Sequence, residues 1–172
     1  MRIIDPVMGD EGRLYSIYDH AYVQQMRRLC RGADVITPNL TEACLLADMP
    51  YLGPQYDAVF MQTLIERLHT LDVRRVLVTG VLFDQQTIGA IGHEEGGELF
   101  TARSTYVDRH FHGTGDVFAG ALVSFLSHGL PFAEAAQRAV DFVSACITDT
   151  LPVIRAMCLR STAAFMPSAT KR

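Results

Sequence analysis

Short, mainly apolar runs alternate along this chain with longer stretches in which apolar residues recur every three or four positions. The short runs predict strands, and they lie at residues 3–4, 34–36 and 76–78. The last run, Val76-Leu77-Val78, is typical of a strand that is buried on both faces of a sheet. The periodic stretches predict three helices: residues 19–31, a short helix from Thr41 as N-cap to about Ala47, and a longer one from Asp57 as N-cap to about Leu71.

The second half of the chain continues this alternation. Residues 86–92 and 98–102 predict two strands around residues 94–97, which is a hairpin signal. Residues 113–116 open a helix that runs to about Ser127. Pro131 starts another helix, which is apolar nearly all round and is therefore expected to be buried. A last helix is predicted over about 153–165, and the tail at 168–172 is expected to be disordered.

Strands that alternate with helices predict an α/β fold with a mostly parallel central sheet flanked by helices. In such sheets ligands bind beyond the carboxyl ends of the strands. Polar residues follow three of the predicted strands, and they are Asp5 and Asp10, Asn39 and Glu42, and Thr79 and Gly80. We therefore expect a binding site where these three strand ends meet.

Composition narrows the class of protein. The 172 residues are 49% hydrophobic and 20% charged, which suits one globular domain over 1–172 and excludes wholesale disorder. The net charge of −4 argues against a nucleic-acid or anionic-membrane partner, and no apolar run reaches the roughly 18 residues of a transmembrane helix. The four cysteines have no C-x-x-C spacing, so we expect buried, reduced thiols and a cytoplasmic protein.

The segment Gly113-Thr114-Gly115-Asp116 carries the first chemical signal. Glycines at the mouth of a helix let successive backbone N–H groups converge, and the helix N-terminus adds partial positive charge. Together they form an anion hole suited to phosphate, and Asp116 beside it can accept a proton from an attacking hydroxyl. The alternative is a plain glycine turn with Asp116 as a favourable acid in the first helical turn.

Two further polar groups carry alternative interpretations. Asp5 and Asp10 lie on one strand-end loop and can hold Mg²⁺ directly or through water, or they form a solvated turn. Asn39 and Glu42 lie three residues apart at a helix start, so both can point into the crevice, or they belong to a cap around Thr41.

The order of these motifs resembles a known family. DPVMGD at 5–10, TPNLTEA at 37–43, VLVTG at 76–80 and HGTGDVFAGAL at 112–122 resemble the C-terminal portion of the ribokinase-like superfamily, and within it the pyridoxal kinases. The resemblance spans roughly residues 2–150. It implies that the N-terminal part of the fold is missing, together with much of the vitamin pocket. The first strand starts almost at Met1, so we expect either a partner chain or upstream residues to cover its edge.

The resemblance implies a role for each motif residue. Asp116 resembles the catalytic base, and Gly113, Thr114 and Gly115 resemble the anion hole for the transferring phosphoryl group. The remaining matches are the ATP-binding positions Asp10, Asn39, Thr79, Val107 and Phe111, of which the last two resemble walls for the adenine, and the metal-side positions Glu42 and Asp5.

The implied activity is transfer of the γ-phosphoryl group of ATP to the 5′-hydroxyl of pyridoxal, pyridoxine or pyridoxamine. It implies Mg²⁺, often a monovalent cation such as K⁺, and a homodimer. Two alternatives stay open. Hydroxymethylpyrimidine kinases share DPVM and TPN but typically carry Cys at the position of Asp116, so Asp116 favours the pyridoxal type. A non-catalytic nucleotide-binding remnant is the other alternative, because the acceptor half of the family fold is largely absent from this sequence.

Overall fold

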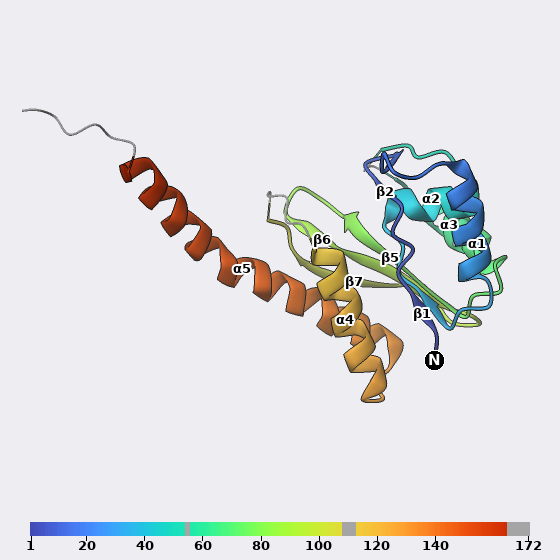
Figure 1. Cartoon of the computed structure of the whole chain (residues 1–172). Coiled ribbons are helices and arrows are strands. Elements are labelled where there is room, and N and C mark those ends of the chain that lie inside the picture. Colours follow the sequence, from blue (N-terminus) through green and yellow to red (C-terminus); the bar gives the residue numbers. More distant parts are fainter. Residues whose placement is uncertain (54–55, 108–112, 165–172) are drawn as a thin grey trace, which may run out of the picture.

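The computed structural model describes residues 1–53, 56–107 and 113–164, with side chains described as far as Thr150 (Figure 1). Its main sheet has the strand order β1-β4-β5-β6-β7. The strands are β1 (Ile3–Ile4), β4 (Val35–Ile36), β5 (Arg75–Leu82), β6 (Thr87–Glu94) and β7 (Phe100–Thr105). The first three are parallel, and β6 runs antiparallel to both of its neighbours, so four of the five strands point the same way. The predicted α/β class with a mostly parallel sheet is therefore confirmed.

Helices cover both faces of this sheet (Figure 1). On one face lie α1 (His20–Cys30), α2 (Leu40–Ala47) and α3 (Ala58–His69), and on the other lie α4 (Thr114–Ser127) and α5 (Phe132–Ala164). The central strand β5 serves both layers, because Val76 and Val78 belong to the first hydrophobic core and Leu77 to the second. All three side chains are fully buried, which confirms the prediction of a strand covered on both faces.

Side-chain caps set where the first helices begin. Asp19 accepts a hydrogen bond from the backbone N–H of Tyr22 at 2.9 Å, and Asp57 accepts one from Phe60 at 2.7 Å. The cap predicted at Thr41 is wrong, because Asn39 is the N-cap of α2. The Thr41 hydroxyl instead accepts a hydrogen bond from the backbone N–H of Gly12 at 2.9 Å and so anchors the preceding loop.

The predicted loop from Asp5 to Gly12 contains regular structure. Here β2 (Gly9–Asp10) pairs with β3 (Arg13–Leu14) in an antiparallel hairpin. Glu11 and Gly12 form the turn, and both have positive φ, at 49° and 77°. Positive φ at both central positions is the requirement of the tight hairpin turn that matches strand twist. Gly9 has no room for a side chain, since a Cβ there would clash with the Arg13 carbonyl oxygen.

The strand β5 does not stop at Thr79-Gly80, as the sequence suggested. It continues to Leu82 because the antiparallel partner β6 extends the ladder, with a bulge between Thr79 and Val81. Gly80 has a φ of +68° at this bulge. The hairpin of β6 and β7 is confirmed, with its second strand shifted to 100–105.

The two helices predicted after Pro131 are one continuous helix, α5, which passes through Pro152 and projects away from the sheet (Figure 1). The prediction that its first part is buried all round is also wrong. Its buried positions form one face, which packs on α4 and β7, and they are Phe132, Ala135, Ala136, Ala139 and Val140. Phe142, farther along the helix, keeps 48% of its surface exposed. The predicted disordered tail at 168–172 lies outside the described residues.

Two cysteines lie in the core as predicted. Cys30 and Cys44 are buried free thiols, and burial raises the pKa of each to about 11. They stay protonated at neutral pH and act as small apolar side chains. Within the described ranges, no helix is both long enough and apolar enough to cross a bilayer.

Candidate functional site

The N-terminus of α4 carries glycine at the N-cap and at the second helical position. Gly113 is its N-cap, with a left-handed φ of 83°, and it makes no side-chain capping hydrogen bond. Among the described residues, nothing lies within 4 Å of a Cβ built at Gly113 or Gly115. The first amides of a helix carry partial positive charge, so a helix start with two glycines suits an anion. The role of residues 113–115 as an anion hole stays a prediction.

Asp116 lies in the first turn of α4 and is exposed. Its negative charge helps to raise the pKa of Asp5, which lies just beyond β1. The fold thus brings the start of α4 and the end of β1 close enough to interact electrostatically. Two carboxylates that repel each other at such a place are stabilised when a cation lies beside them.

A hydrogen bond positions the Asp5 carboxylate at the end of β1. Its Oδ1 accepts a hydrogen bond of 3.1 Å from the hydroxyl of Thr37, a side chain that is 2% exposed. Burial is the largest cause that raises the pKa of Asp5, the Thr37 hydrogen bond opposes it, and Asp116 adds to it. The end of β1 and the end of β4 are therefore joined directly through these two side chains.

Asn39 and Glu42 form a capping box at the start of α2. The Asn39 Oδ1 accepts from the Glu42 N–H at 2.9 Å, and the Glu42 Oε2 accepts from the Asn39 N–H at 2.9 Å. The same two side chains hold the loop before the β2–β3 hairpin. Glu42 Oε1 accepts from the Met8 N–H at 3.0 Å, and the Asn39 amide donates to the Gly9 carbonyl at 2.8 Å.

Glu42 is a buried acid, with 3% of its surface exposed. Burial raises its pKa to about 7, the hydrogen bonds from the backbone of Asn39 and Met8 oppose this rise, and the charge of Asp5 adds to it. Among the described residues, neither Glu42 nor Asp5 makes an ion pair with Lys, Arg or His. A capping role for Asn39 and Glu42 is thus visible in the structure, and their role toward Mg²⁺ stays a prediction.

A small cleft of about 80 Å³ lies between the β2–β3 hairpin, the start of α2 and the bulge of β5. Its lining is made of Asp10, Asn39, Leu40, Thr41, Tyr51, Tyr56, Gly80 and Leu82. Beside it, the Thr79 N–H donates to the Pro38 carbonyl at 2.9 Å, which joins β5 to the segment before α2. The expectation that polar residues from these strand ends meet at one edge of the sheet is confirmed.

The two aromatic wall residues of this cleft were not predicted. Tyr51 and Tyr56 come from the segment between α2 and α3, which carries no family motif in the sequence analysis. The ring of Tyr51 covers Gly12, where a Cβ would lie 2.5 Å from the ring. The Tyr56 hydroxyl donates to the Leu82 carbonyl at 3.1 Å. The one signal in the sequence for this contact is Gly12 at the hairpin turn, because a glycine leaves room for an aromatic ring.

Only some of the other predicted residues line the cleft. Burial is the largest cause that raises the pKa of Tyr15, and the charges of Asp10, Glu42 and Asp5 add to it, so these three carboxyl groups share one electrostatic neighbourhood. Val107 is half-buried and is not among the residues that line the cleft. Phe111 lies outside the described residues. The roles of these residues stay predictions.

The carboxyl groups at the strand ends are candidate ligands for a metal ion. Across residues 1–53, 56–107 and 113–150, no group of three or more His, Cys, Asp and Glu side chains is arranged to hold a metal ion. Mg²⁺ does not need such a group, since it keeps several waters and is commonly bound by one or two carboxylates together with substrate phosphates. Oxygen ligands from Asp5, Asp10 and Glu42, free of ion pairs within the described chain, fit that pattern.

Comparison with known proteins identifies the family. The family model described as phosphomethylpyrimidine kinase matches residues 1–158, which is most of the chain. The chain belongs to the phosphomethylpyrimidine kinase family. A relative described as pyridoxine kinase, from Bacillus subtilis, is 29% identical over 154 residues, covering 88% of this chain and 55% of the relative. The chain thus spans about half the length of the curated relatives that it matches.

Solved structures of phosphomethylpyrimidine kinase family proteins and of pyridoxal kinases have the same fold. A putative phosphomethylpyrimidine kinase from Bacteroides thetaiotaomicron superposes with a TM-score of 0.82 at 32% identity, covering 87% of this chain and 52% of the other. Pyridoxal kinase from Leishmania donovani, in complex with ADP and pyridoxamine, superposes with a TM-score of 0.76 at 30% identity, covering 87% and 50%. The ribokinase-like resemblance drawn from the motifs is therefore confirmed.

Proposed function

We propose that this chain carries the nucleotide-binding and phosphoryl-transfer site of an ATP-dependent kinase that phosphorylates the 5′-hydroxyl of pyridoxal, pyridoxine or pyridoxamine. The observation that carries the proposal is the start of α4, where Gly113 has a left-handed conformation and the charge of Asp116 acts on Asp5. Relatives described as pyridoxine kinase and pyridoxal kinase support the choice of acceptor.

In this proposal the backbone amides of residues 113–115 hold the oxygens of the transferring phosphoryl group. The acceptor hydroxyl attacks the γ-phosphorus, the bond to the β-phosphate oxygen breaks, and the hydroxyl proton passes to the carboxylate of Asp116. Because the transition state of phosphoryl transfer is loose, positioning and charge stabilisation matter more than a strong base. An exposed carboxylate at a helix start is suited to accept a proton late in such a reaction.

Mg²⁺, when bound, would neutralise the negative charge of the nucleotide phosphates. Asp5 and Glu42 are the residues that would hold it, directly or through water, because their carboxyl groups lie together at the strand ends. Thr37 keeps Asp5 in place, and the capping box keeps Glu42 in place. These side chains therefore order the phosphate end of the site before substrate arrives.

The cleft beside the β2–β3 hairpin is the proposed position of the nucleotide phosphates. We expect Mg²⁺–ADP to raise the melting temperature of the chain, because a ligand that binds the folded state stabilises it. Asp10→Asn should weaken Mg²⁺–ATP binding by about tenfold, since Asp10 lines the cleft at the metal side. Isothermal titration calorimetry measures the affinity.

The matched control is Glu98→Gln, which removes an exposed carboxylate beyond the end of β6, outside the cleft lining. Its affinity for Mg²⁺–ATP should equal that of the wild type. Equal affinities for Asp10→Asn and the wild type would contradict the placement of the phosphates in this cleft.

A second candidate is a hydroxymethylpyrimidine kinase, because the matching family model and the Bacteroides thetaiotaomicron structure carry phosphomethylpyrimidine kinase descriptions. ADP release measured with pyridoxal and with hydroxymethylpyrimidine as acceptors separates the two candidates. Turnover with the pyrimidine alone would replace the proposed acceptor. Binding of ATP without turnover of either acceptor would instead support a nucleotide-binding module without catalysis.

A further inference from the structure

Two histidines outside the candidate site contact each other directly. His69 is the last residue of α3, and His93 lies near the end of β6. The His69 Nε2 and the His93 Nδ1 lie 2.7 Å apart, and the two rings meet edge to face at 73°. The contact is partly buried, so solvent reaches one side of it.

Backbone carbonyl groups fix the proton on the far nitrogen of each ring. The His69 Nδ1 lies 2.7 Å from the Val73 carbonyl oxygen, and the His93 Nε2 lies 3.2 Å from the Gly97 carbonyl oxygen. A carbonyl oxygen only accepts, so both far nitrogens must be the N–H donors of their rings. In the neutral rings, the His69 Nε2 and the His93 Nδ1 then each carry a lone pair and no proton. Facing lone pairs at 2.7 Å repel each other unless a proton or a metal ion lies between or beside them.

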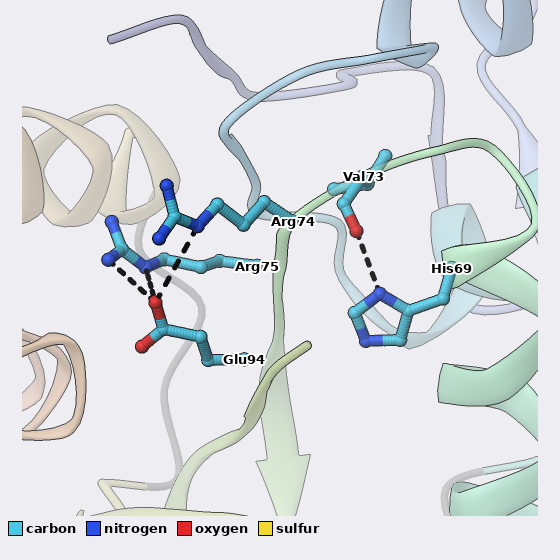
Figure 2. Close-up of polar contacts among 5 residues, drawn as sticks. All are labelled: His69, Val73, Arg74, Arg75 and Glu94. Carbon is cyan, nitrogen blue, oxygen red and sulfur yellow. Dashed lines mark hydrogen bonds and ion pairs between the residues drawn. The ribbon is translucent and has the colours of Figure 1, made fainter. Parts of the chain in front are cut away.

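The nearest charged side chains in β5 and β6 lie on the other face of the sheet from this pair. His93 and Glu94 are neighbours in β6 and lie on opposite faces of the sheet. Glu94 pairs there with Arg75 at 2.7 Å and with Arg74 at 3.9 Å. Figure 2 shows both arginines on the far side of β5 from His69, with Val73 beside the His69 ring. The pair also lies at the C-terminus of α3, where the helix dipole favours positive charge.

We propose that His69 and His93 bind one divalent transition-metal ion of the Zn²⁺ class, through the His69 Nε2 and the His93 Nδ1. Metal-binding histidines characteristically donate their other ring N–H to a carbonyl or carboxylate, and Val73 and Gly97 supply those acceptors here. Imidazole nitrogens select Zn²⁺, Ni²⁺ or Cu²⁺ over Mg²⁺, which prefers oxygen ligands. The site is therefore chemically distinct from the acidic site at the strand ends.

Metal binding requires a small movement of the two rings. Zn–N bonds are about 2.0–2.1 Å long, so two tetrahedral ligand nitrogens stand roughly 3.3 Å apart. The rings must separate by roughly half an ångström from their present 2.7 Å, a rotation that the partly exposed contact allows. Within the described residues no third His, Cys, Asp or Glu completes the set, so water fills the other positions. Such a site ties the end of α3 to the turn between β6 and β7.

The direct test is nuclear magnetic resonance of the ¹⁵N-labelled full chain during a titration with ZnCl₂. Binding should shift the His69 Nε2 and His93 Nδ1 resonances together, while the far nitrogens stay protonated. Zn²⁺ at a few times its dissociation constant should also raise the melting temperature by about 2–4 °C. Resonances that never respond to Zn²⁺, with a proton shared between the rings, would overturn the proposal.

Variants give an independent test. His69→Gln and His93→Gln should each abolish the Zn²⁺-dependent rise in melting temperature. His20→Gln and His128→Gln, which change exposed histidines elsewhere, should retain it. A rise that persists in both pair variants would overturn the proposal. Because Gln can still donate a hydrogen bond to a backbone carbonyl, these variants should stay folded. If one of them unfolds, the response of the wild-type resonances to Zn²⁺ still tests the proposal.

Discussion

Asp116→Ala should lower kcat for phosphoryl transfer by about 10²–10⁴-fold, which is the range for removing a general base. Asp116 lies in the first turn of α4, beside the amides of residues 113–115, and its negative charge acts on Asp5. Removing the carboxylate leaves the amides in place, so Mg²⁺–ATP should still bind with close to wild-type affinity. Formation of pyridoxal phosphate under saturating substrates measures kcat, and calorimetry measures the affinity.

The control for this variant is Asp149→Asn, which changes an exposed carboxylate of α5 that takes no part in the proposed site. It should turn over at the wild-type rate. Wild-type kcat in Asp116→Ala would refute the assignment of Asp116 as the base. If neither the wild type nor the variant turns over any acceptor while ATP still binds, the non-catalytic alternative gains support and the kinase proposal fails for this chain.

Much of the fold could be predicted from local sequence patterns such as helix caps and apolar runs. Asp57 was predicted to cap α3 because a short acid stands just before a run of helical periodicity, and its side chain does accept from Phe60. The burial of residues 76–78 followed from an uninterrupted apolar run. The cap of α2 was assigned to Thr41, although the spacing of Asn39 and Glu42 is itself that of a capping box. The sequence analysis considered only the cap at Thr41, and the structure shows the reciprocal hydrogen bonds of Asn39 and Glu42 instead.

The errors arose where tertiary context decides. The β2–β3 hairpin was missed because its turn is Glu11-Gly12 and not the Asn-Gly or Asp-Gly that signals such turns. The continuous α5 was divided at Pro152, since a proline normally ends a helix. Its exposed Phe142 was expected to be buried, because a composition rich in alanine does not show which face lacks a partner.

The candidate site was predicted in part. The rule that ligands bind at the carboxyl ends of parallel strands placed Asp5, Asn39 and Thr79 at one edge of the sheet. That rule cannot supply the aromatic walls Tyr51 and Tyr56, which come from a segment without a motif. It also says nothing of His69 and His93, whose contact depends on how α3 packs against β6.

Glu42→Ala should lower the free energy of unfolding by about 2–5 kcal/mol and the melting temperature by roughly 5–15 °C. The buried carboxylate accepts from the backbone N–H groups of Met8 and Asn39, and alanine would leave both donors without this acceptor. Urea denaturation measures the change. Glu98→Ala, which removes an exposed acid, should change stability by less than about 0.5 kcal/mol. A loss in Glu42→Ala as small as that would contradict the structural role of the capping box.

The same residue predicts a dependence of stability on pH. Burial raises the pKa of Glu42 from 4.5 to about 7, so between these values the folded state holds a proton that the unfolded state has lost. Stability from this group should therefore fall as pH rises from about 4.5 to 7, by roughly 1–3 kcal/mol. Glu42→Gln cannot ionise, so its stability should lack this fall. Unfolding free energies of both proteins at pH 5 and pH 8 provide the comparison, and equal pH dependence would contradict the assignment.

Glu42→Gln also separates the two roles considered for this residue. Gln fills the same volume and can still accept one backbone hydrogen bond, so most of the cap survives, whereas the negative charge is lost. If Glu42 helps to hold Mg²⁺ at the nucleotide phosphates, affinity for Mg²⁺–ATP should fall about 10- to 100-fold. Affinity for ATP measured without Mg²⁺ should hold steady or improve, because a negative charge near the phosphates is gone. Unchanged Mg²⁺–ATP affinity would limit Glu42 to the cap of α2 and leave Asp5 and Asp10 as the metal-side carboxylates.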